Sequence, residues 1–144
     1  MVTNYLTTKD FLVFITQAAF TKLVRDNDTK ILDSENMAYG YINEKLSARY
    51  NVSSEASHSG ESRNSSFVRW MTILTVYFLY QSVPDDDIPE RVRLNYEDVM
   101  KEIDRVAVGK DNCTLPFIVD STTGKPKTNF QWYSEPRRSH NPFE

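Results

Sequence analysis

The sequence is short of the residue types that most often build catalytic, redox and metal sites. Its 144 residues include one cysteine, four glycines and two histidines. A single cysteine, Cys113, excludes a disulfide within the chain, and no cysteine-protease signature surrounds it. Four glycines provide little material for a phosphate-binding loop, and neither an HExxH nor a CxxC motif occurs. His58 and His140 lie in polar segments without further ligands at metal-site spacing, so we predict no enzyme activity, no cofactor and no metal site.

Long apolar runs are absent as well. The most apolar window, FVRWMTILTVYFLY (67–80), is shorter than the roughly 20 residues of a membrane span, and Arg69 interrupts it. The first ten residues lack the basic start and apolar run of a signal peptide. A net charge of −3 gives no reason to expect nucleic-acid or membrane binding from charge alone. These features indicate one domain of ordinary size without a membrane segment.

Two patterns in the first 50 residues predict helices. Thr7 and Asp10 have capping-box spacing, and Thr16 is placed to cap a second short helix. From Asp28 to Tyr50 the apolar residues return about every 3.6 positions, which predicts an amphipathic helix of roughly 20 residues. Gly40 costs this helix up to about 1 kcal/mol relative to alanine. We interpret it as a point where another helix approaches closely.

Two further helices follow a serine-rich segment. Residues 67–83 are apolar on nearly every face, which predicts a central helix packed on several sides. The next helix has Asp87 as its predicted cap, Glu90 completing a capping box and Pro89 in the first turn. Gly109 supplies its stop. The three aspartates that end at Asp87 are explained by the helix dipole, which favours acids at an N-terminus.

The remaining segments predict a loop and a C-terminal arm. Residues 53–66 are rich in serine and polar throughout except Ala56, which predicts a flexible loop that ends at Asn64, a plausible helix cap. After residue 110 the pattern changes to TLPFIVD, the turn STTGKPKTN and FQWY, which would make a short β-hairpin. The ending EPRRSHNPFE contains two prolines and cannot form a regular helix.

The predicted fold is therefore mainly α. Residues 1–110 form a small bundle of about four to five helices, which includes the loop 53–66. Residues 111–144 form a short C-terminal β-hairpin or extended arm. Two strands alone are marginally stable in water, so this part needs the helices or another subunit beside it.

Four passages resemble the helical head–tail connector (adaptor) proteins of tailed bacteriophages, in particular the Mu-like family. YLTTKDF (5–11) is similar to that family's opening, and INEKLSARYNV (42–52) to the end of its second helix, with an Arg-Tyr pair. Residues 63–110 resemble its core pair of helices, joined by a short proline-bearing link. The ending EPRRSHNPF is similar to the short basic tails of some members.

The resemblance implies a structural protein of the virion neck, made in the cytoplasm of a bacterial host. It implies a ring of about a dozen copies on the portal protein, with tail or stopper proteins below and genomic DNA passing through the lumen. A mildly acidic chain suits non-specific passage of DNA better than binding. We predict that six arm residues hold the portal or a neighbouring subunit, because aromatic and arginine side chains dominate interfaces. They are Phe130, Trp132, Tyr133, Arg137, Arg138 and Phe143.

Two other functions compete with the connector. One is a small helical module that binds a cytosolic partner and is not part of a virion. The other is a cell-wall hydrolase carried in the neck, which needs a pair of carboxylates. The nearest such pairs are Glu97 with Asp98 and Glu102 with Asp104. We interpret both as solvated residues on a helix face. For the aromatic residues at 130–133, packing as a strand on their own bundle is the alternative to an interface.

Overall fold

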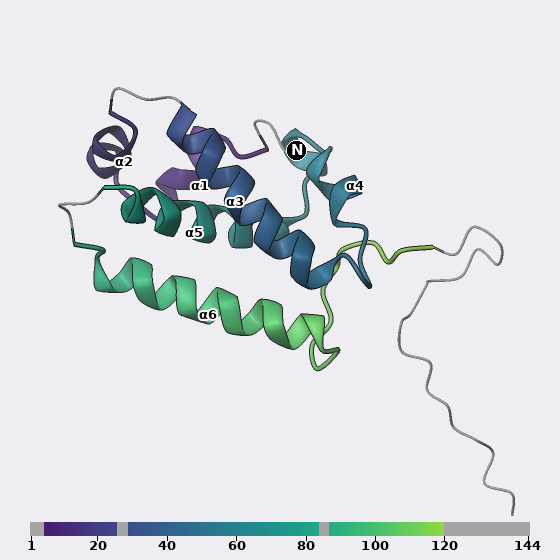
Figure 1. Cartoon of the computed structure of the whole chain (residues 1–144). Helices are drawn as coiled ribbons and strands as arrows, with labels where there is room; N and C mark the ends of the chain where they lie inside the picture. The colour runs from purple at the N-terminus through teal and green to yellow at the C-terminus, as the bar shows by residue number, and fades with distance from the viewer. Residues whose placement is uncertain (1–4, 26–28, 84–86, 120–144) are drawn as a thin grey trace, which may run out of the picture.

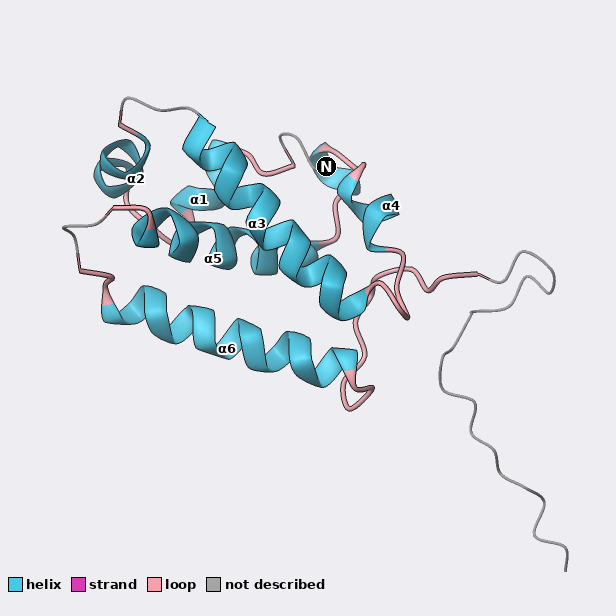
Figure 2. Cartoon of the chain, viewed as in Figure 1, coloured by secondary structure: helices cyan, strands magenta, loops and turns pink. Residues whose placement is uncertain are grey.

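The computed structural model describes residues 5–25, 29–83 and 87–119 of the chain, and these fold into a helical bundle (Figures 1 and 2). The described residues contain six α-helices and one short 3₁₀ helix, which confirms the mainly α prediction. They are α1 (Thr8–Leu12), α2 (Gln17–Val24), α3 (Thr29–Leu46), α4 (Val52–Ala56), η1 (Gly60–Ser62), α5 (Ser65–Gln81) and α6 (Glu90–Ala107).

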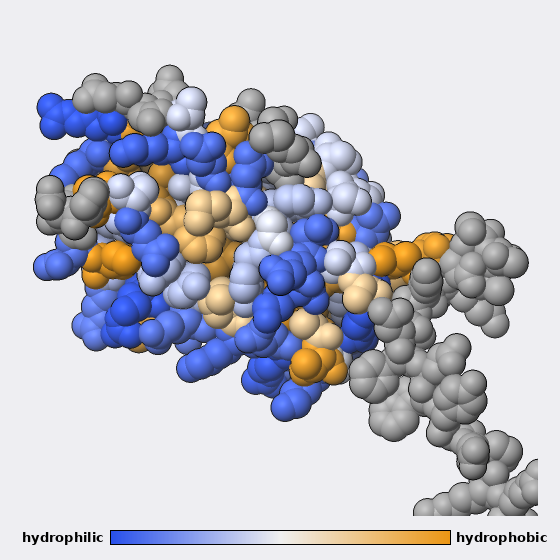
Figure 3. All heavy atoms as spheres, viewed as in Figure 1, coloured by the Kyte–Doolittle hydropathy of each residue, from blue (hydrophilic) through white to orange (hydrophobic). Residues whose placement is uncertain are grey.

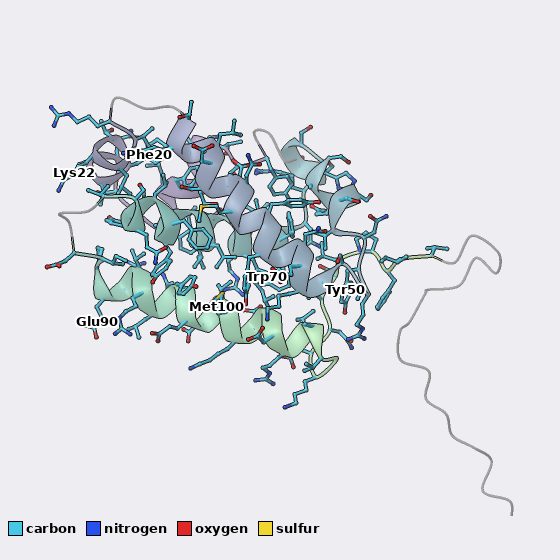
Figure 4. The ribbon with its side chains drawn as sticks, in the orientation of Figure 1. Phe20, Lys22, Tyr50, Trp70, Glu90 and Met100 are labelled. Atoms are coloured by element: carbon cyan, nitrogen blue, oxygen red, sulfur yellow. The ribbon has the colours of Figure 1, made fainter. Side chains whose placement is uncertain are left out.

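Helix α5 is the centre of the bundle, as its all-round apolar sequence predicts. It contacts α3, α6, α1 and α2, and nine of its seventeen residues are buried. Figure 1 shows α5 between α3 and α6, with α2 at the end where α5 terminates. Trp70, the largest side chain of the core, is 1% exposed and lies between the ribbons of α3 and α6 in Figure 4. The core therefore forms around α5.

The predicted caps of the first two helices and of α5 are present. Thr7 and Asp10 form the capping box of α1, and the Thr16 hydroxyl accepts a hydrogen bond from the Ala19 N–H at the start of α2. The Asn64 side chain accepts from the Phe67 N–H at the start of α5. These caps satisfy backbone donors that a helix start leaves free. The predicted cap of α3, Asp28, lies outside the described residues.

The serine-rich segment 53–66 is not the continuous loop that its composition predicts. Val52–Ala56 form α4, capped by Asn51, and Gly60–Ser62 form η1. Glu55 in α4 is only 3% exposed, so the prediction of a flexible polar loop is wrong at that residue. The reason is a set of hydrogen bonds from distant parts of the chain, described below, which compensate the burial of its carboxylate.

The start of α6 also differs from the prediction. Its N-cap is Pro89, whose backbone is extended at φ −54° and ψ 139°, so neither the Asp87 cap nor the capping box with Glu90 forms. The Pro89 carbonyl accepts a hydrogen bond from the Arg93 N–H at 3.1 Å. A proline can supply this carbonyl while its missing N–H costs nothing at a helix start. The predicted end is confirmed, because Gly109 adopts a positive φ of 81°.

The described part of the C-terminal segment packs on the end of α3. Tyr50 and Phe117 form an isolated antiparallel bridge, flanked by hydrogen bonds from Asn51 N–H to the Pro116 carbonyl (2.7 Å) and from Ile118 N–H to the Arg49 carbonyl (3.1 Å). The two rings stack with centroids 5.0 Å apart. The expected hairpin is not supported, since residues 5–25, 29–83 and 87–119 contain no strand beyond isolated bridges. Its second half, FQWY, lies outside the described residues.

Gly40 is not a point of close approach. It lies on the exposed side of α3, and a Cβ atom built at this position meets nothing within 4 Å. The prediction of a neighbouring helix at Gly40 is therefore wrong. The glycine only weakens the helix, through the larger conformational freedom that it loses on folding.

Replacing Gly40 by alanine is expected to raise the free energy of unfolding by up to about 1 kcal/mol, because alanine is the better helix former and the site is open. Gly109→Ala is the opposite case. Its positive φ is unfavourable for a side chain by about 1–2 kcal/mol, and its Cβ would lie 2.8 Å from an Arg49 guanidinium nitrogen. Urea unfolding measures both variants. A Gly40→Ala variant less stable than the wild type would show that a neighbour does occupy this face.

Candidate functional site

The six arm residues predicted to form an interface all lie outside the described residues. They are Phe130, Trp132, Tyr133, Arg137, Arg138 and Phe143. The described chain reaches Val119, which is 58% exposed and leaves the bundle beside the end of α3 (Figure 1). The arm therefore starts from this end of the molecule.

Three of the four carboxylates of the hydrolase alternative lie close to basic side chains on α6 and its neighbours. Glu97 accepts a hydrogen bond from Arg93 at 2.8 Å, and Glu102 forms an ion pair with Arg69 of α5. Asp104 lies 3.6 Å from the Lys45 ammonium of α3, while Asp98 is exposed. No observation at these four residues indicates a cleft with two facing carboxylates.

Cys113 and His58 each lie beside one polar side chain. Cys113 is half-buried beside Tyr50, and burial raises the pKa of its thiol. A raised pKa disfavours the reactive thiolate. His58 Nδ1 lies 3.0 Å from a Glu55 carboxylate oxygen. Within the described residues, no group of three or more His, Cys, Asp and Glu side chains is arranged to hold a metal ion.

The most concentrated set of charged contacts is a buried polar cluster formed by Tyr5, Asp10, Glu35, Glu55 and Arg63. Glu55 of α4 makes several of its contacts. One of its carboxylate oxygens accepts from the Tyr5 hydroxyl at 2.8 Å and from the Asn64 backbone N–H. The other faces His58. Tyr5 and Glu55 are 50 residues apart in the chain, so this contact joins the N-terminal segment to α4 and to the start of α5.

Arg63 and Glu35 complete the polar cluster. The Arg63 guanidinium donates to Asp10 at 2.7 Å and to the Tyr5 carbonyl at 3.0 Å, and it lies 5.6 Å from the centre of the Tyr5 ring. Glu35 of α3 is 1% exposed and accepts from the Tyr5 and Leu6 N–H groups at 2.7 and 3.2 Å. The backbone before α1 is thus held by a carboxylate on one side and by a guanidinium on the other.

The pKa shifts in the polar cluster follow from these contacts. Burial alone raises the pKa of Asp10, but the hydrogen bonds from Arg63 and Thr7 outweigh it, and the net pKa is lowered. For Glu35 burial dominates over the two backbone hydrogen bonds, and the pKa is raised. Burial and the Glu55 carboxylate also raise the pKa of Tyr5. A tyrosine that stays protonated donates to Glu55, so the arrangement acts as a structural connection and offers no free base.

Sequence reasoning missed the polar cluster because its members are far apart in the chain. The local signal was weak: Glu55 and Arg63 lie in a serine-rich segment that also contains the exposed acid Glu61. Charged side chains in such a segment are usually solvated. Only the folded arrangement brings Tyr5 and Asp10 to them.

A groove that contains apolar side chains lies between α3 and α5. It has a volume of about 340 Å³ and is lined by Lys30, Asp33, Ser34, Met37, Phe78, Gln81 and Ser82. Met37 is 56% exposed. Figure 3 shows apolar side chains among hydrophilic ones on this face of the molecule. The groove is thus a mixed surface, apolar at Met37 and Phe78 and polar at its rim.

An aromatic cluster continues from this groove towards α6. The rings of Tyr77 and Tyr96 stack with centroids 3.7 Å apart, and Phe78 meets Tyr96 edge-on at 6.2 Å. Tyr41 of α3 lies near Asp104, and burial together with that carboxylate raises its pKa to about 12. These rings fix α5 against α6, so the surface beside Phe78 is held by packing.

Comparison with known proteins found no family model that matches the chain, and no curated protein or solved structure that is significantly similar to it. Among the described helices, none is long and apolar enough to span a membrane.

Glu55→Ala is expected to lower the free energy of unfolding by about 3 kcal/mol. The change leaves the buried Tyr5 hydroxyl and the Asn64 N–H without an acceptor, and each such loss costs about 1–3 kcal/mol. The matched control is Glu61→Ala, an exposed acid in the same serine-rich segment, expected within about 0.5 kcal/mol of the wild type. Equal stabilities of the two variants in urea would show that residues 53–66 do not support the fold.

Asp10→Asn is expected to reduce the acid sensitivity of the fold. Since the pKa of Asp10 is lowered in the folded chain, its contribution is present above its unfolded pKa of about 3.9 and is lost as the pH falls through the folded value. Glu35, with a raised pKa, acts in the opposite direction. Urea unfolding between about pH 5 and pH 3 should show a smaller loss of stability in Asp10→Asn than in the wild type. Asp98→Asn, at an exposed residue of α6, should follow the wild type; equal slopes in all three proteins would contradict the assignment.

Proposed function

We propose that this chain is a structural head–tail connector of a tailed bacteriophage, which forms a ring on the portal protein in the virion neck. The observation that carries the proposal is the resemblance of residues 63–110 to the core pair of helices in that family. In the fold these residues form α5 and α6, with the apolar helix in the centre. The resemblance supplies the function, and the arrangement of the two helices is compatible with it.

The charge distribution supports passage of DNA without binding. Residues 120–144 contain four basic and three acidic side chains, so of the net −3 the remaining residues 1–119 carry −4. A bundle of this sign repels a phosphate backbone at its surface. A ring of such bundles would line a channel for DNA without holding it.

The surface of the bundle has no single large apolar face among its described residues, so assembly would depend on small contact areas. Its exposed large apolar residues are distributed over several elements, namely Leu12, Val13, Met37, Leu94, Val108, Phe117 and Val119. Scattered residues of this kind are common on monomers and do not form one large obligate interface. The arm, with four aromatic side chains and two adjacent arginines, is then the segment best equipped to hold the portal or a neighbouring copy.

Deleting residues 136–144 is expected to leave the helical circular dichroism unchanged, because the described helices and the buried side chains that hold them together lie between Tyr5 and Leu115. Association with the portal protein in reconstituted neck complexes should be lost. A variant in which the same nine residues are replaced by a Gly/Ser sequence of equal length controls for chain length. Loss of helical signal would show that the segment belongs to the core.

The connector itself is tested by electron microscopy of neck complexes and by analysis of purified virions. The chain is expected as a ring on the portal. A chain that is absent from virions and never associates with portal protein would overturn the proposal and favour a small cytosolic binding module.

A further inference from the structure

The α3–α5 groove combines an apolar floor with a negative end. Met37 of α3 and Phe78 of α5 supply the floor, and methionine adapts readily to different aromatic partners. At one edge α5 ends at Gln81, where the Ser82 N–H and hydroxyl both bond to the Leu79 carbonyl. A helix C-terminus carries a partial negative charge. The groove therefore favours a ligand with an apolar group beside a cation.

Asp33 strengthens this preference. Its carboxylate lies on the groove wall next to Ser34, one turn of α3 before Met37. Lys30 is the one basic side chain among the described residues that line the groove. A guanidinium can bond to a carboxylate and to helix carbonyls in the same plane, which an ammonium cannot do as well. The chemistry that fits is an extended peptide with an aromatic residue and an arginine a few positions apart.

The chain contains such a peptide outside the described residues. Residues 130–143, FQWYSEPRRSHNPF, carry four aromatic side chains and the pair Arg137–Arg138, and the prolines at 136 and 142 reduce the freedom that an extended peptide loses on binding. Residues 120–144 have a net charge of +1 against −4 for the rest of the chain. The signs are complementary.

We propose that the α3–α5 groove of one copy binds residues 130–143 of a neighbouring copy. An aromatic side chain of the arm packs on Met37 and Phe78, and Arg137 or Arg138 meets Asp33 and the end of α5. The inference rests on the proposed ring, and it assigns the arm to the adjacent subunit.

The positions of the groove and of the arm favour a second copy. The groove is formed by the first half of α3 and the last residues of α5, at the end where Figure 4 labels Phe20 and Glu90. The described chain ends at Val119, at the opposite end of the bundle beside Tyr50, and runs away from the helices (Figures 1 and 4). The ten residues 120–129 can span up to about 35 Å. An arm at one end and its groove at the other make a head-to-tail contact, which forms a ring when the rotation between successive copies closes.

Recognition is tested with a fluorescein-labelled peptide of residues 128–144. The receptor is the full chain with Arg137→Glu and Arg138→Glu, so that its own arm does not compete. Fluorescence anisotropy should show saturable binding, weakened at least tenfold by Met37→Lys. Leu94→Lys, at another exposed apolar helix residue, should have no effect. Asp33→Arg should weaken the wild-type peptide and restore the Arg137→Glu, Arg138→Glu peptide. Equal binding by the Met37→Lys and Leu94→Lys receptors, or no binding at millimolar peptide, would overturn the inference.

The neighbouring copy is tested by mixing two full-length variants. Met37→Lys has an intact arm and no groove, whereas Arg137→Glu, Arg138→Glu has an intact groove and no arm. Above the dissociation constant of the peptide, sedimentation velocity should show each variant as a monomer, their mixture as a 1:1 dimer, and the wild type as larger species. A wild type that stays monomeric at these concentrations would show that the arm occupies its own groove.

The outcomes separate this inference from the connector function. If Met37→Lys still assembles into rings in the neck, the groove assignment is wrong and the connector proposal stands. If the peptide binds the groove and the mixture forms a dimer, but the chain is absent from virions, self-association is correct and the connector proposal is wrong.

Discussion

The buried carboxylate of Glu55 is the constraint on which the rest of the fold depends. A carboxylate that is 3% exposed is tolerated only when donors surround it, and here the donors come from Tyr5, Asn64 and His58. Satisfying this one group places α4, the N-terminal segment and the first turn of α5 in a fixed relation. Because Asn64 also caps α5 and donates from its side chain to Thr114, the same junction reaches the C-terminal segment. The central helix α5 therefore starts where the N-terminal segment, α4 and the C-terminal segment meet.

The two ends of the bundle differ in how their surface side chains are held. At the end of α3, Arg49 donates to the last turn of α6 through the Val106 carbonyl, and Tyr50 stacks on Phe117. The chain thus leaves the bundle from a well-supported base. At the other end lies the groove beside Met37 and Phe78, and the described residues that line it include one basic and one acidic side chain, Lys30 and Asp33. A rigid exit at one end and an open groove at the other suit repeated head-to-tail contacts between copies, each of which positions the next.

The parts of the fold that sequence could predict are those encoded by local spacing. The apolar period of α3 and the all-round apolar sequence of α5 each reflect which sides of a helix are buried. The caps at Thr7, Thr16 and Asn64 act within three residues. Failures occur where the deciding contact is distant or where an alternative cap exists. The composition of residues 53–66 predicted a loop. That prediction missed the burial of Glu55, because the partners of its carboxylate lie up to 50 residues away. Local spacing favoured Asp87 as the cap of α6, whereas the extended backbone of Pro89 starts the helix two residues later. The groove was not predicted, because it depends on how α3 crosses α5.

An arm is also the physically reasonable way for this bundle to assemble. A stable interface needs about 800 Å² on each partner, and it is usually built around a buried cluster of large side chains. The exposed apolar residues of the bundle are spread from Leu12 to Val119. Trp70 is buried in the core, and the half-buried rings of Tyr77 and Tyr96 stack on each other. An extended segment that binds in a groove supplies contact area without any large apolar face on the monomer.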